Sequence, residues 1–215
     1  PMKMLAGINQ KLSHPIDIKL SRPQQKSYPY INGLYLLLRA SGLSQLTIQG
    51  KKQLLVIDAE VWRSWETLNP TERYFNLLEI WLRRSNAEIL GGDRDALGML
   101  FRLLTFWSRI PDRGITYESY QSQEDLRLPE LYNVALLELF GFIAIEQGET
   151  EQGKGWRIKC IHRLPFGDAM MDLLVDICAK TDFESWLEQD STNDWAIGEW
   201  QPAIKPFFPE WERNI

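Results

Sequence analysis

The chain has 215 residues, of which 44% are apolar and 12% aromatic, and it carries a net charge of −5. This composition allows one large domain or two small ones with a buried core, and it excludes a chain that is disordered throughout. Two cysteines cannot build a disulfide framework, and no run approaches the ~20 consecutive apolar residues of a membrane span. Because no signal-peptide pattern is present either, we expect a cytoplasmic protein without a membrane partner.

The charge is divided unevenly along the chain. Residues 1–63 hold 9 Lys and Arg against 3 Asp and Glu, a net of +6, whereas residues 121–215 hold 8 against 18, a net of −10. An anion-binding surface is therefore expected in the N-terminal third, unless the basic and acidic parts face each other inside one fold. The first 28 residues are polar and basic, and we interpret them as an arm with one short extended piece at 16–20.

A helix and a β-hairpin are predicted after the arm. The segment 30–43 (YINGLYLLLRASGL) has leucines at helical spacing and Gly42 as a C-terminal stop, which indicates a helix. Two strands follow in 45–58 (QLTIQGKKQLLVID), around a turn at 50–52. The residues 59–68 (AEVWRSWETL) then predict a short helix.

Two apolar helices are predicted in the middle of the chain. The first, in 69–85 (NPTERYFNLLEIWLRRS), has a clear start: Asn69 is a suitable cap, Pro70 suits the first helical position, and Glu72 occupies the capping-box position. The second, in 94–110 (RDALGMLFRLLTFWSRI), is apolar around most of its girth, so we expect it to be central in the fold.

The second half of the chain repeats the alternation of helix and hairpin. A polar stretch at 116–129 is expected to hold a short helix, and 130–142 (ELYNVALLELFGF) a longer one. A hairpin with a long polar tip follows at 140–160, and then a helix at 167–180. A short helix and extended, Pro-punctuated chain are expected in the last 35 residues.

An internal repeat is indicated at an offset of 99 residues. Residues 37–48 (LLRASGLSQLTI) and 136–147 (LLELFGFIAIEQ) both show a leucine-rich helix that stops at a glycine, an apolar residue and the start of a strand. The alternative is a coincidence, since a helix joined to a strand by glycine is common. In the second copy, helix, strand, hairpin tip, strand and helix follow one another, and this layout resembles winged-helix domains.

The predicted fold class is α+β, mostly α, with two winged-helix-like units whose short β-hairpins are the wings. Apolar helices at 70–85 and 93–109 are expected to join the two units. The predicted domains are a basic arm (1–28), a first winged-helix-like unit (29–90), a second winged-helix-like unit (91–180) and an acidic, aromatic tail or linker (181–215).

A more specific resemblance covers most of residues 29–175. The segments INGLYLLLRASGL, LNPTERYFNLLEIWL, LLELFGFI and PFGDAMMDLL resemble the N-terminal region of the Ri-plasmid ORF-three-like family, whose proteins are associated with plasmids and transposon passengers. The C-terminal WQPAIKPFFPEW is similar to the junction that precedes that family's own C-terminal domain. The resemblance implies a prokaryotic mobile-element context. It carries no established activity and therefore no catalytic residues.

Catalytic and metal-binding patterns are weak. No nucleotide-binding loop, zinc-protease motif or nucleophile elbow is present, and the chain has only two histidines. Cys160 and His162 are placed to share one face of a strand, but zinc needs about four ligands, so a buried thiol beside a surface imidazole is the preferred interpretation. The sequence GGDRD at 91–95 is similar to a cyclase turn, yet it precedes a helix, where Asp93 serves as a cap.

Carboxylates at helical spacing do not indicate an active site. Asp168, Asp172 and Asp176 recur every four residues, and we interpret them as the solvated face of a helix. The opposite, buried face is expected to hold Met171, Leu174 and Val175. We therefore expect a non-enzyme with no cofactor, no metal and no small-molecule substrate.

DNA binding is an alternative that favours the N-terminal third. The second hairpin tip carries Glu146, Glu149 and Glu151, which would repel phosphates, and only Lys154 and Arg157 oppose them. The first unit is more suitable because its wing and the arm are basic. The candidate nucleic-acid-binding residues are Lys11, Lys19, Arg22, Lys26, Lys51 and Lys52.

Protein–protein interaction or dimerisation is the preferred function. Winged-helix units often serve as docking modules, and the last 35 residues combine aromatic side chains with an excess of acids. Such a tail suits a strip that lies in a groove, or it wraps over its own core. The expected partners are accordingly another protein or a second copy, with DNA as the alternative.

Overall fold

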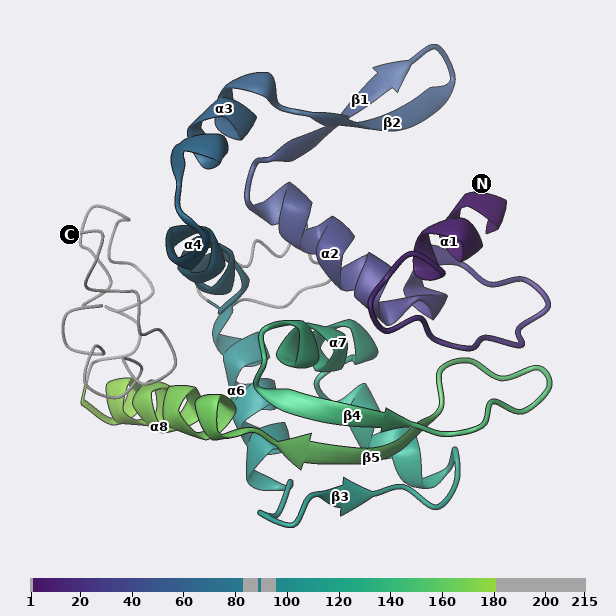
Figure 1. Cartoon of the computed structure of the whole chain (residues 1–215), viewed down its shortest axis with the longest axis vertical. Coiled ribbons are helices and arrows are strands. Elements are labelled where there is room, and N and C mark those ends of the chain that lie inside the picture. Colours follow the sequence, from purple (N-terminus) through teal and green to yellow (C-terminus); the bar gives the residue numbers. More distant parts are fainter. Residues whose placement is uncertain (1, 83–88, 90–95, 181–215) are drawn as a thin grey trace. The chain divides into compact units, whose positions relative to one another are not determined.

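The computed structural model describes residues 2–82, 89 and 96–180 (Figure 1). Helices make up about half of the described residues, and the strands form two small antiparallel sheets, so the predicted α+β class is confirmed. The chain divides into two compact units. Of the described residues, 34–82, 89 and 96–100 form the hairpin unit, and 2–33 and 101–180 form the sheet unit. The described residues of the arm lie in the same unit as the described residues from 101 to 180.

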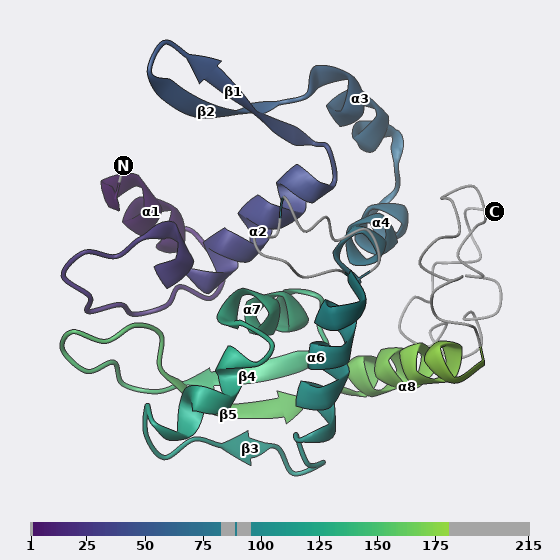
Figure 2. The ribbon, with the colours of Figure 1, turned by 180° about the vertical axis from the view of Figure 1, so that it is seen from behind.

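The sheet unit is built around a three-stranded sheet in the order β3-β5-β4 (Figure 2). Its strands are β3 (Ile115–Thr116), β4 (Ile143–Gln147) and β5 (Ile158–Arg163), and β5 pairs antiparallel with both neighbours through Ile161. Strand β3 was not predicted. It places the predicted hairpin strands inside a wider sheet.

This unit also contains helical segments. The α-helices follow apolar segments of the sequence, whereas the 3-10 helix lies in the polar stretch at 116–129. The helical segments are α6 (Ala96–Ser108), the 3-10 turn η2 (Ser122–Arg127), α7 (Leu131–Leu139) and α8 (Pro165–Lys180). The part of α6 in this unit crosses one face of the sheet, behind it in Figure 1 and in front of it in Figure 2. Phe106 of α6, Leu136 of α7 and Ile161 of β5 are almost completely buried, so the core lies between these elements.

The N-terminal arm contains a helix that the sequence analysis did not predict. Helix α1 spans Met2–Asn9, and a 3-10 turn, η1, spans Gln25–Ser27. Buried Asn9 ends α1: its Nδ2 donates to the Ile16 carbonyl at 2.9 Å and its Oδ1 accepts from the Ile16 N–H at 3.2 Å. An eight-residue helix is too short to be stable alone, so these two hydrogen bonds contribute to its stability.

The hairpin unit begins inside α2 (Pro29–Ala40) and contains the second sheet. Among the described strands, that sheet contains β1 (Ser44–Gln49) and β2 (Lys52–Ile57), and α3 (Ala59–Thr67), α4 (Pro70–Leu82) and the start of α6 follow. The capping box at the start of α4 is confirmed. Asn69 Oδ1 accepts from the Glu72 N–H at 2.9 Å, and Glu72 Oε2 accepts from the Asn69 N–H at 2.7 Å.

The two repeats agree in their element bounds. Helix α2 ends at Ala40 and β1 begins at Ser44, and the offset of 99 leads to the end of α7 at Leu139 and the start of β4 at Ile143. Gly42 and Gly141 stop the helices with the same φ of +73°, a conformation that favours glycine. Helix, two strands and helix follow in both copies. The finer winged-helix arrangement stays a prediction.

Three predictions fall on parts of the chain outside the described residues. These are the break at Gly91-Gly92, the cap at Asp93 and the acidic, aromatic tail from residue 181 onward.

Candidate interaction surface

The β1–β2 hairpin exposes apolar side chains. Residues opposite each other in the register lie on the same face, so Leu46, Ile48, Leu55 and Ile57 share one face of this two-stranded sheet. The exposed fractions are 78% for Ile48, 43% for Leu55 and 63% for Ile57, and Leu46 is half-buried. We call these four side chains the apolar hairpin face. They form a continuous strip because Leu46 and Leu55 are direct partners between the other two.

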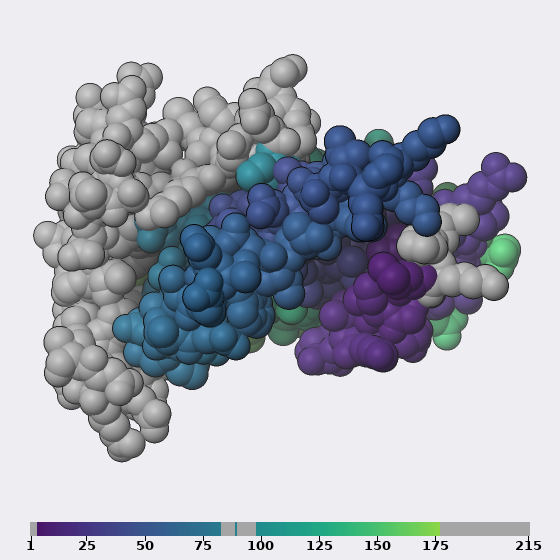
Figure 3. All heavy atoms as spheres, turned by 90° about the horizontal axis from the view of Figure 1, so that it is seen from above, coloured from purple at the N-terminus to yellow at the C-terminus, as the bar shows by residue number. Residues whose placement is uncertain are grey.

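The turn of this hairpin brings two lysines to its tip. Gly50 and Lys51 connect the strands between the pair Gln49 and Lys52, and Gly50 has a φ of +64°, as a type II′ turn requires at its first central position. Lys51 and Lys52 are both exposed. Residues 44–57 contain no acidic residue. The atoms of the hairpin and of α3, in shades of blue, lie at the surface in the space-filling view (Figure 3).

The second hairpin, β4–β5, has its long tip occupied by the N-terminal arm. The Lys19 N–H donates to the Lys154 carbonyl at 3.0 Å, and the Gly153 N–H donates to the Lys19 carbonyl at 2.9 Å. Thr150 Oγ1 adds a bond to the Asp17 carbonyl at 3.0 Å. The arm and this tip run side by side in both ribbon views (Figures 1 and 2). The tip of the β4–β5 hairpin therefore contacts the N-terminal arm at Asp17 and Lys19.

Aromatic packing at the base of the tip strengthens this attachment. Trp156 is buried, and its ring lies 5.2 Å from that of Tyr30 at the start of α2. The Tyr30 hydroxyl donates to Glu138 of α7, whose other oxygen accepts from the Ile145 N–H at 2.8 Å. Burial, with the Glu138 carboxylate second, raises the pKa of Tyr30 far above its usual value, so the hydroxyl stays protonated.

The sequence analysis placed Arg157 on the acidic wing, and this placement is wrong. Arg157 is only 8% exposed, and its guanidinium donates to Gln123 Oε1 at 2.6 Å and to the carbonyls of Tyr117 and Ile158. The guanidinium also lies 5.5 Å from the Tyr120 ring. Arg157 thus joins β5 to the segment before α7. Two of its partners, Gln123 and Tyr117, are 34 and 40 residues away, so no local signal could have found this role.

The acidic character of the β4–β5 hairpin is also reduced in the structure. Glu146 pairs with Lys159 at 2.5 Å, and this contact raises the pKa of the lysine. Glu149 and Glu151 are exposed near the arm-contacting residues of the tip. Because the arm is joined to a tip that carries these carboxylates, the local potential is less favourable for phosphates than the arm sequence indicates.

The six predicted basic residues are all exposed, but they are divided between the two units. Lys11, Lys19, Arg22 and Lys26 belong to the sheet unit, whereas Lys51 and Lys52 belong to the hairpin unit. Lys19 is also paired with Asp17 at 3.7 Å. Exposure is what phosphate contact requires. The six residues remain candidates for nucleic-acid binding.

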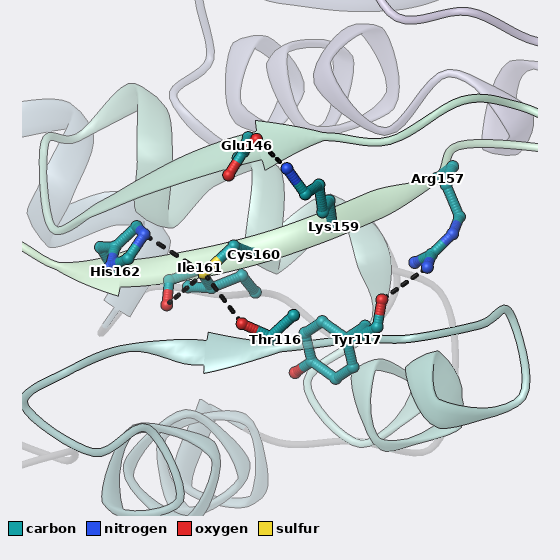
Figure 4. Close-up of polar contacts among 8 residues, drawn as sticks. All are labelled: Thr116, Tyr117, Glu146, Arg157, Lys159, Cys160, Ile161 and His162. Atoms are coloured by element: carbon teal, nitrogen blue, oxygen red, sulfur yellow. Dashed lines mark hydrogen bonds and ion pairs between the residues drawn. The ribbon is translucent and has the colours of Figure 1, made fainter.

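The Cys160 and His162 side chains lie close together, as their spacing predicted (Figure 4). Cys160 Sγ is 3.2 Å from His162 Nε2, and Thr116 Oγ1 of β3 donates to the sulfur at 3.6 Å. The thiol is buried and the imidazole is exposed. No group of three or more potential metal ligands occurs among the described residues, and the side chain of Cys178 is outside them. The expected arrangement of a buried thiol beside a surface imidazole is confirmed.

Tyr117 lies next to this cluster with a buried hydroxyl. Within the described part of the chain, its oxygen has no hydrogen-bond partner. Burial, followed by the nearby Asp125 and Cys160, raises the pKa of Tyr117 to about 12. Its backbone carbonyl, in contrast, accepts from Arg157.

The aspartate stripe of α8 is solvated only in part. Asp172 and Asp176 are exposed, but Asp168 forms an ion pair with Arg163 of β5. Met171 and Leu174 are buried as predicted. The prediction for Val175 is wrong: it is 51% exposed, because it lies too far around the helix from the sheet.

Comparisons with known proteins find no matching family model, curated protein or solved structure. In the described part of the chain, no helix is long and apolar enough to cross a membrane. Functional assignment therefore depends on the geometry of the two hairpins.

Proposed function

We propose that the protein is a non-catalytic interaction module that binds another protein through the apolar hairpin face. The observation that carries this proposal is the exposure of Ile48, Leu55 and Ile57 side by side on a two-stranded sheet. Exposed apolar strips of this kind are typical of interaction sites. The resemblance to the Ri-plasmid ORF-three-like family supports a mobile-element context for the module.

The size of the face sets a requirement for the partner. Burying the exposed parts of the three side chains would contribute about 3–5 kcal/mol, at ~1.5–3 kcal/mol for a whole aliphatic side chain. Association costs about 4–15 kcal/mol in lost freedom of motion, so this strip alone supports only weak binding. The outer edges of β1 and β2 carry backbone groups that pair with no other described strand. A partner that adds a strand to an edge would supply the missing contacts.

Site-specific photo-crosslinking tests the proposal. A photoreactive amino acid replaces Ile48 on the apolar hairpin face in the full chain, expressed in the native host. The matched control replaces Thr47, the exposed neighbour on the opposite face. We expect one defined protein adduct from position 48 and at least several-fold less from position 47. Equal labelling from both positions, or no adduct from either, would contradict the proposal.

DNA binding through the N-terminal third is the second candidate function. The observation that favours it is the exposure of all six predicted basic residues, above all Lys51 and Lys52 on a tip without acids. Binding carried by phosphate contacts weakens steeply as salt increases. The apolar hairpin face has no role in this alternative.

A mobility-shift assay with duplex DNA separates the two candidates. DNA binding predicts a shift at low salt that is lost in the double variant Lys51→Glu, Lys52→Glu and retained in Ile48→Ser. Absence of any shift at 50 mM salt would remove this candidate. If the double variant still shifts the DNA, the phosphate contacts lie on the arm and not at the hairpin tip.

A further inference from the structure

The outer edge of strand β2 is open in the described part of the chain, where β1 is its sole strand partner. The Asp58 N–H, just after β2, donates to the Leu43 carbonyl at 3.0 Å, on the β1 side. Because backbone groups alternate in direction along an antiparallel strand, those of Gln53, Leu55 and Ile57 point to the outer edge. All three residues are exposed. This edge can therefore accept a further strand.

The sequence at this edge is complementary to itself when two copies run antiparallel. Residues 52–58 (KQLLVID) have a cation at one end, an anion at the other and mostly apolar residues between them. With Leu55 of one copy opposite Leu55 of the other, Lys52 lies opposite Asp58, and Leu54 opposite Val56. The match is the same from both copies, as a two-fold interface requires. The two Leu55 residues then exchange backbone hydrogen bonds, since their N–H and C=O groups point to the open edge.

Lys52 and Asp58 are both available for an ion pair between copies. Within the described part of the chain, neither forms one. Asp58 Oδ1 accepts from two N–H groups at the start of α3, whereas Oδ2 accepts from Gln45 Nε2 at the long distance of 3.4 Å.

The two charged residues also lie on one side of the hairpin. The backbone of Asp58 is still extended, with φ −77° and ψ 112°, so the alternation of β2 continues to it. Lys52 and Asp58 therefore lie on the same face, opposite the apolar hairpin face. Their backbone groups point to β1, so between copies they would form a pair without backbone hydrogen bonds, in which side chains approach most closely.

Other registers and the other edge lack this match. The smallest shift that keeps the outward backbone groups opposite each other is two residues. It places Asp58 opposite Gly50 or Leu54 and separates the charges. Strand β1 contains no charged residue, so pairing through its edge has no charge complementarity. The self-complementary pattern of β2 therefore favours a second copy as the occupant of its edge.

We propose that two copies of the chain pair through the outer edges of β2, antiparallel and centred on Leu55, in a four-stranded sheet of order β1-β2-β2-β1. Lys52 of each copy forms an ion pair with Asp58 of the other, and these pairs fix the register. The pairing leaves both apolar hairpin faces exposed on the same side of the sheet. The inference thus goes beyond the proposed function: it adds self-association and doubles the apolar surface offered to another protein.

Sedimentation equilibrium of the full chain at 50 mM salt tests this pairing by charge exchange. We expect a dimer in equilibrium with monomer. Lys52→Glu and Asp58→Lys each place like charges together at both ends of the pairing, so each alone should weaken the dimer at least tenfold. An equimolar mixture of these variants restores both ion pairs in the heterodimer, and its dissociation constant should return to within about threefold of the original.

Two controls separate charge pairing from other effects. Lys51→Glu makes the same change of charge in the turn, outside the paired residues, and should alter the dissociation constant less than about threefold. Asp58→Lys also removes the cap of α3, so circular dichroism checks that it folds. A folding defect in this variant would not be rescued by mixing.

A chain that stays monomeric at millimolar concentration, or a dimer that neither charge variant weakens, would overturn the inference. A mixture that associates no more tightly than the single variants would also overturn it, as would a dimer that Ile48→Ser disrupts, because the interface would then be the apolar hairpin face. If crosslinking at position 48 captures another protein while the chain stays monomeric, the proposed function stands and the pairing is wrong. If the dimer behaves as expected but position 48 gives no adduct, the pairing stands and the proposed function is wrong.

Discussion

The two β-hairpins of this protein have the same sequence layout and different surroundings. Each follows a helix that ends in glycine, and each leads into another helix. In the β4–β5 hairpin, Ile143, Ile158 and Ile161 are buried, a third strand is added, and the tip is attached to the N-terminal arm. The β1–β2 hairpin pairs with no third strand of the described chain and exposes its isoleucines.

This difference shows that the local sequence determines whether a hairpin forms. Segments distant in the sequence determine whether its side chains are buried. Strand β3 and the arm are far from β4 and β5 in the sequence. Strand β3 pairs with β5 and the arm binds the tip, so this hairpin is packed into a core. The β1–β2 hairpin lacks such neighbours among the described strands, so its apolar side chains remain available. The β4–β5 hairpin is therefore part of a packed core, whereas the β1–β2 hairpin exposes apolar side chains to solvent.

The largest expected difference between the hairpins concerns isoleucine packing. Ile161→Ala in β5 removes a completely buried side chain and should destabilise the fold by about 3 kcal/mol. Ile48→Ala in β1 should change the free energy of unfolding by less than about 0.5 kcal/mol, since the side chain is exposed. Urea denaturation of both variants measures this. A cost above 2 kcal/mol for Ile48→Ala would show that the β1–β2 face is covered.

The second prediction concerns Arg157, the buried cation that connects the start of β5 to Tyr117 and Gln123. Arg157→Met should cost about 2 kcal/mol, because the Tyr117 carbonyl loses its charge-assisted bond while Gln123 keeps the Ile158 N–H. The matched control is Arg127→Met, which removes an exposed pair with Glu124 and should cost less than about 0.5 kcal/mol. Similar losses for both variants, measured by urea denaturation, would contradict the buried role of Arg157.

The third prediction concerns the buried hydroxyl beside the β4–β5 sheet. Tyr117→Phe removes a hydroxyl without a partner in the described chain and should stabilise the fold by about 1 kcal/mol at pH 7. Tyr117 has a pKa of about 12, raised from 10.0, so it stays protonated in the folded state while the unfolded chain ionises. Stability is therefore lost as pH rises from 10 to 12.

This loss should reach about 1.4 kcal/mol per pH unit relative to Tyr117→Phe, which cannot ionise at this position. Denaturation at pH 8, 10 and 11 measures the difference between the two proteins. A variant that is less stable than the original at pH 7 would show that the hydroxyl has a bonding partner. A constant difference across the pH range would contradict the raised pKa.

The smallest expected effect tests what the two repeats share. Gly42→Ala and Gly141→Ala each place a Cβ at a φ of +73° with no atom within 4 Å, so only backbone strain should be added. Each should cost about 1 kcal/mol, and the two costs should agree within about 0.3 kcal/mol. Thermal denaturation measures both. Clearly unequal costs would show that the helix ends differ despite their common pattern.

Short-range signals were sufficient to predict most of the elements. The capping box at Asn69 and Glu72, the turn at Gly50 and the glycine stops at Gly42 and Gly141 each act within a few residues. These features depend on local backbone chemistry, which the sequence displays directly.

Long-range pairing was missed. Strand β3 has only two residues, too few to show an alternating pattern. Helix α1 is stabilised by hydrogen bonds between Asn9 and Ile16. The burial of Arg157 depends on residues that are 34 and 40 positions away in the sequence. The apolar hairpin face had a visible signal, since Leu46 and Ile48 alternate with polar residues. Its exposure could not be predicted, because strand pairing is long-range and a covering strand can come from any part of a chain.

Amide hydrogen exchange on the full chain tests the contrast between the two hairpins most directly. The account predicts that the paired amides of β5, such as that of Ile161, exchange only through global unfolding. The paired amides of β1 and β2 should exchange at least a hundredfold faster, because this hairpin opens without disturbing a core. Equal protection of the two hairpins would contradict the account, since it would show that β1–β2 is also part of a packed core.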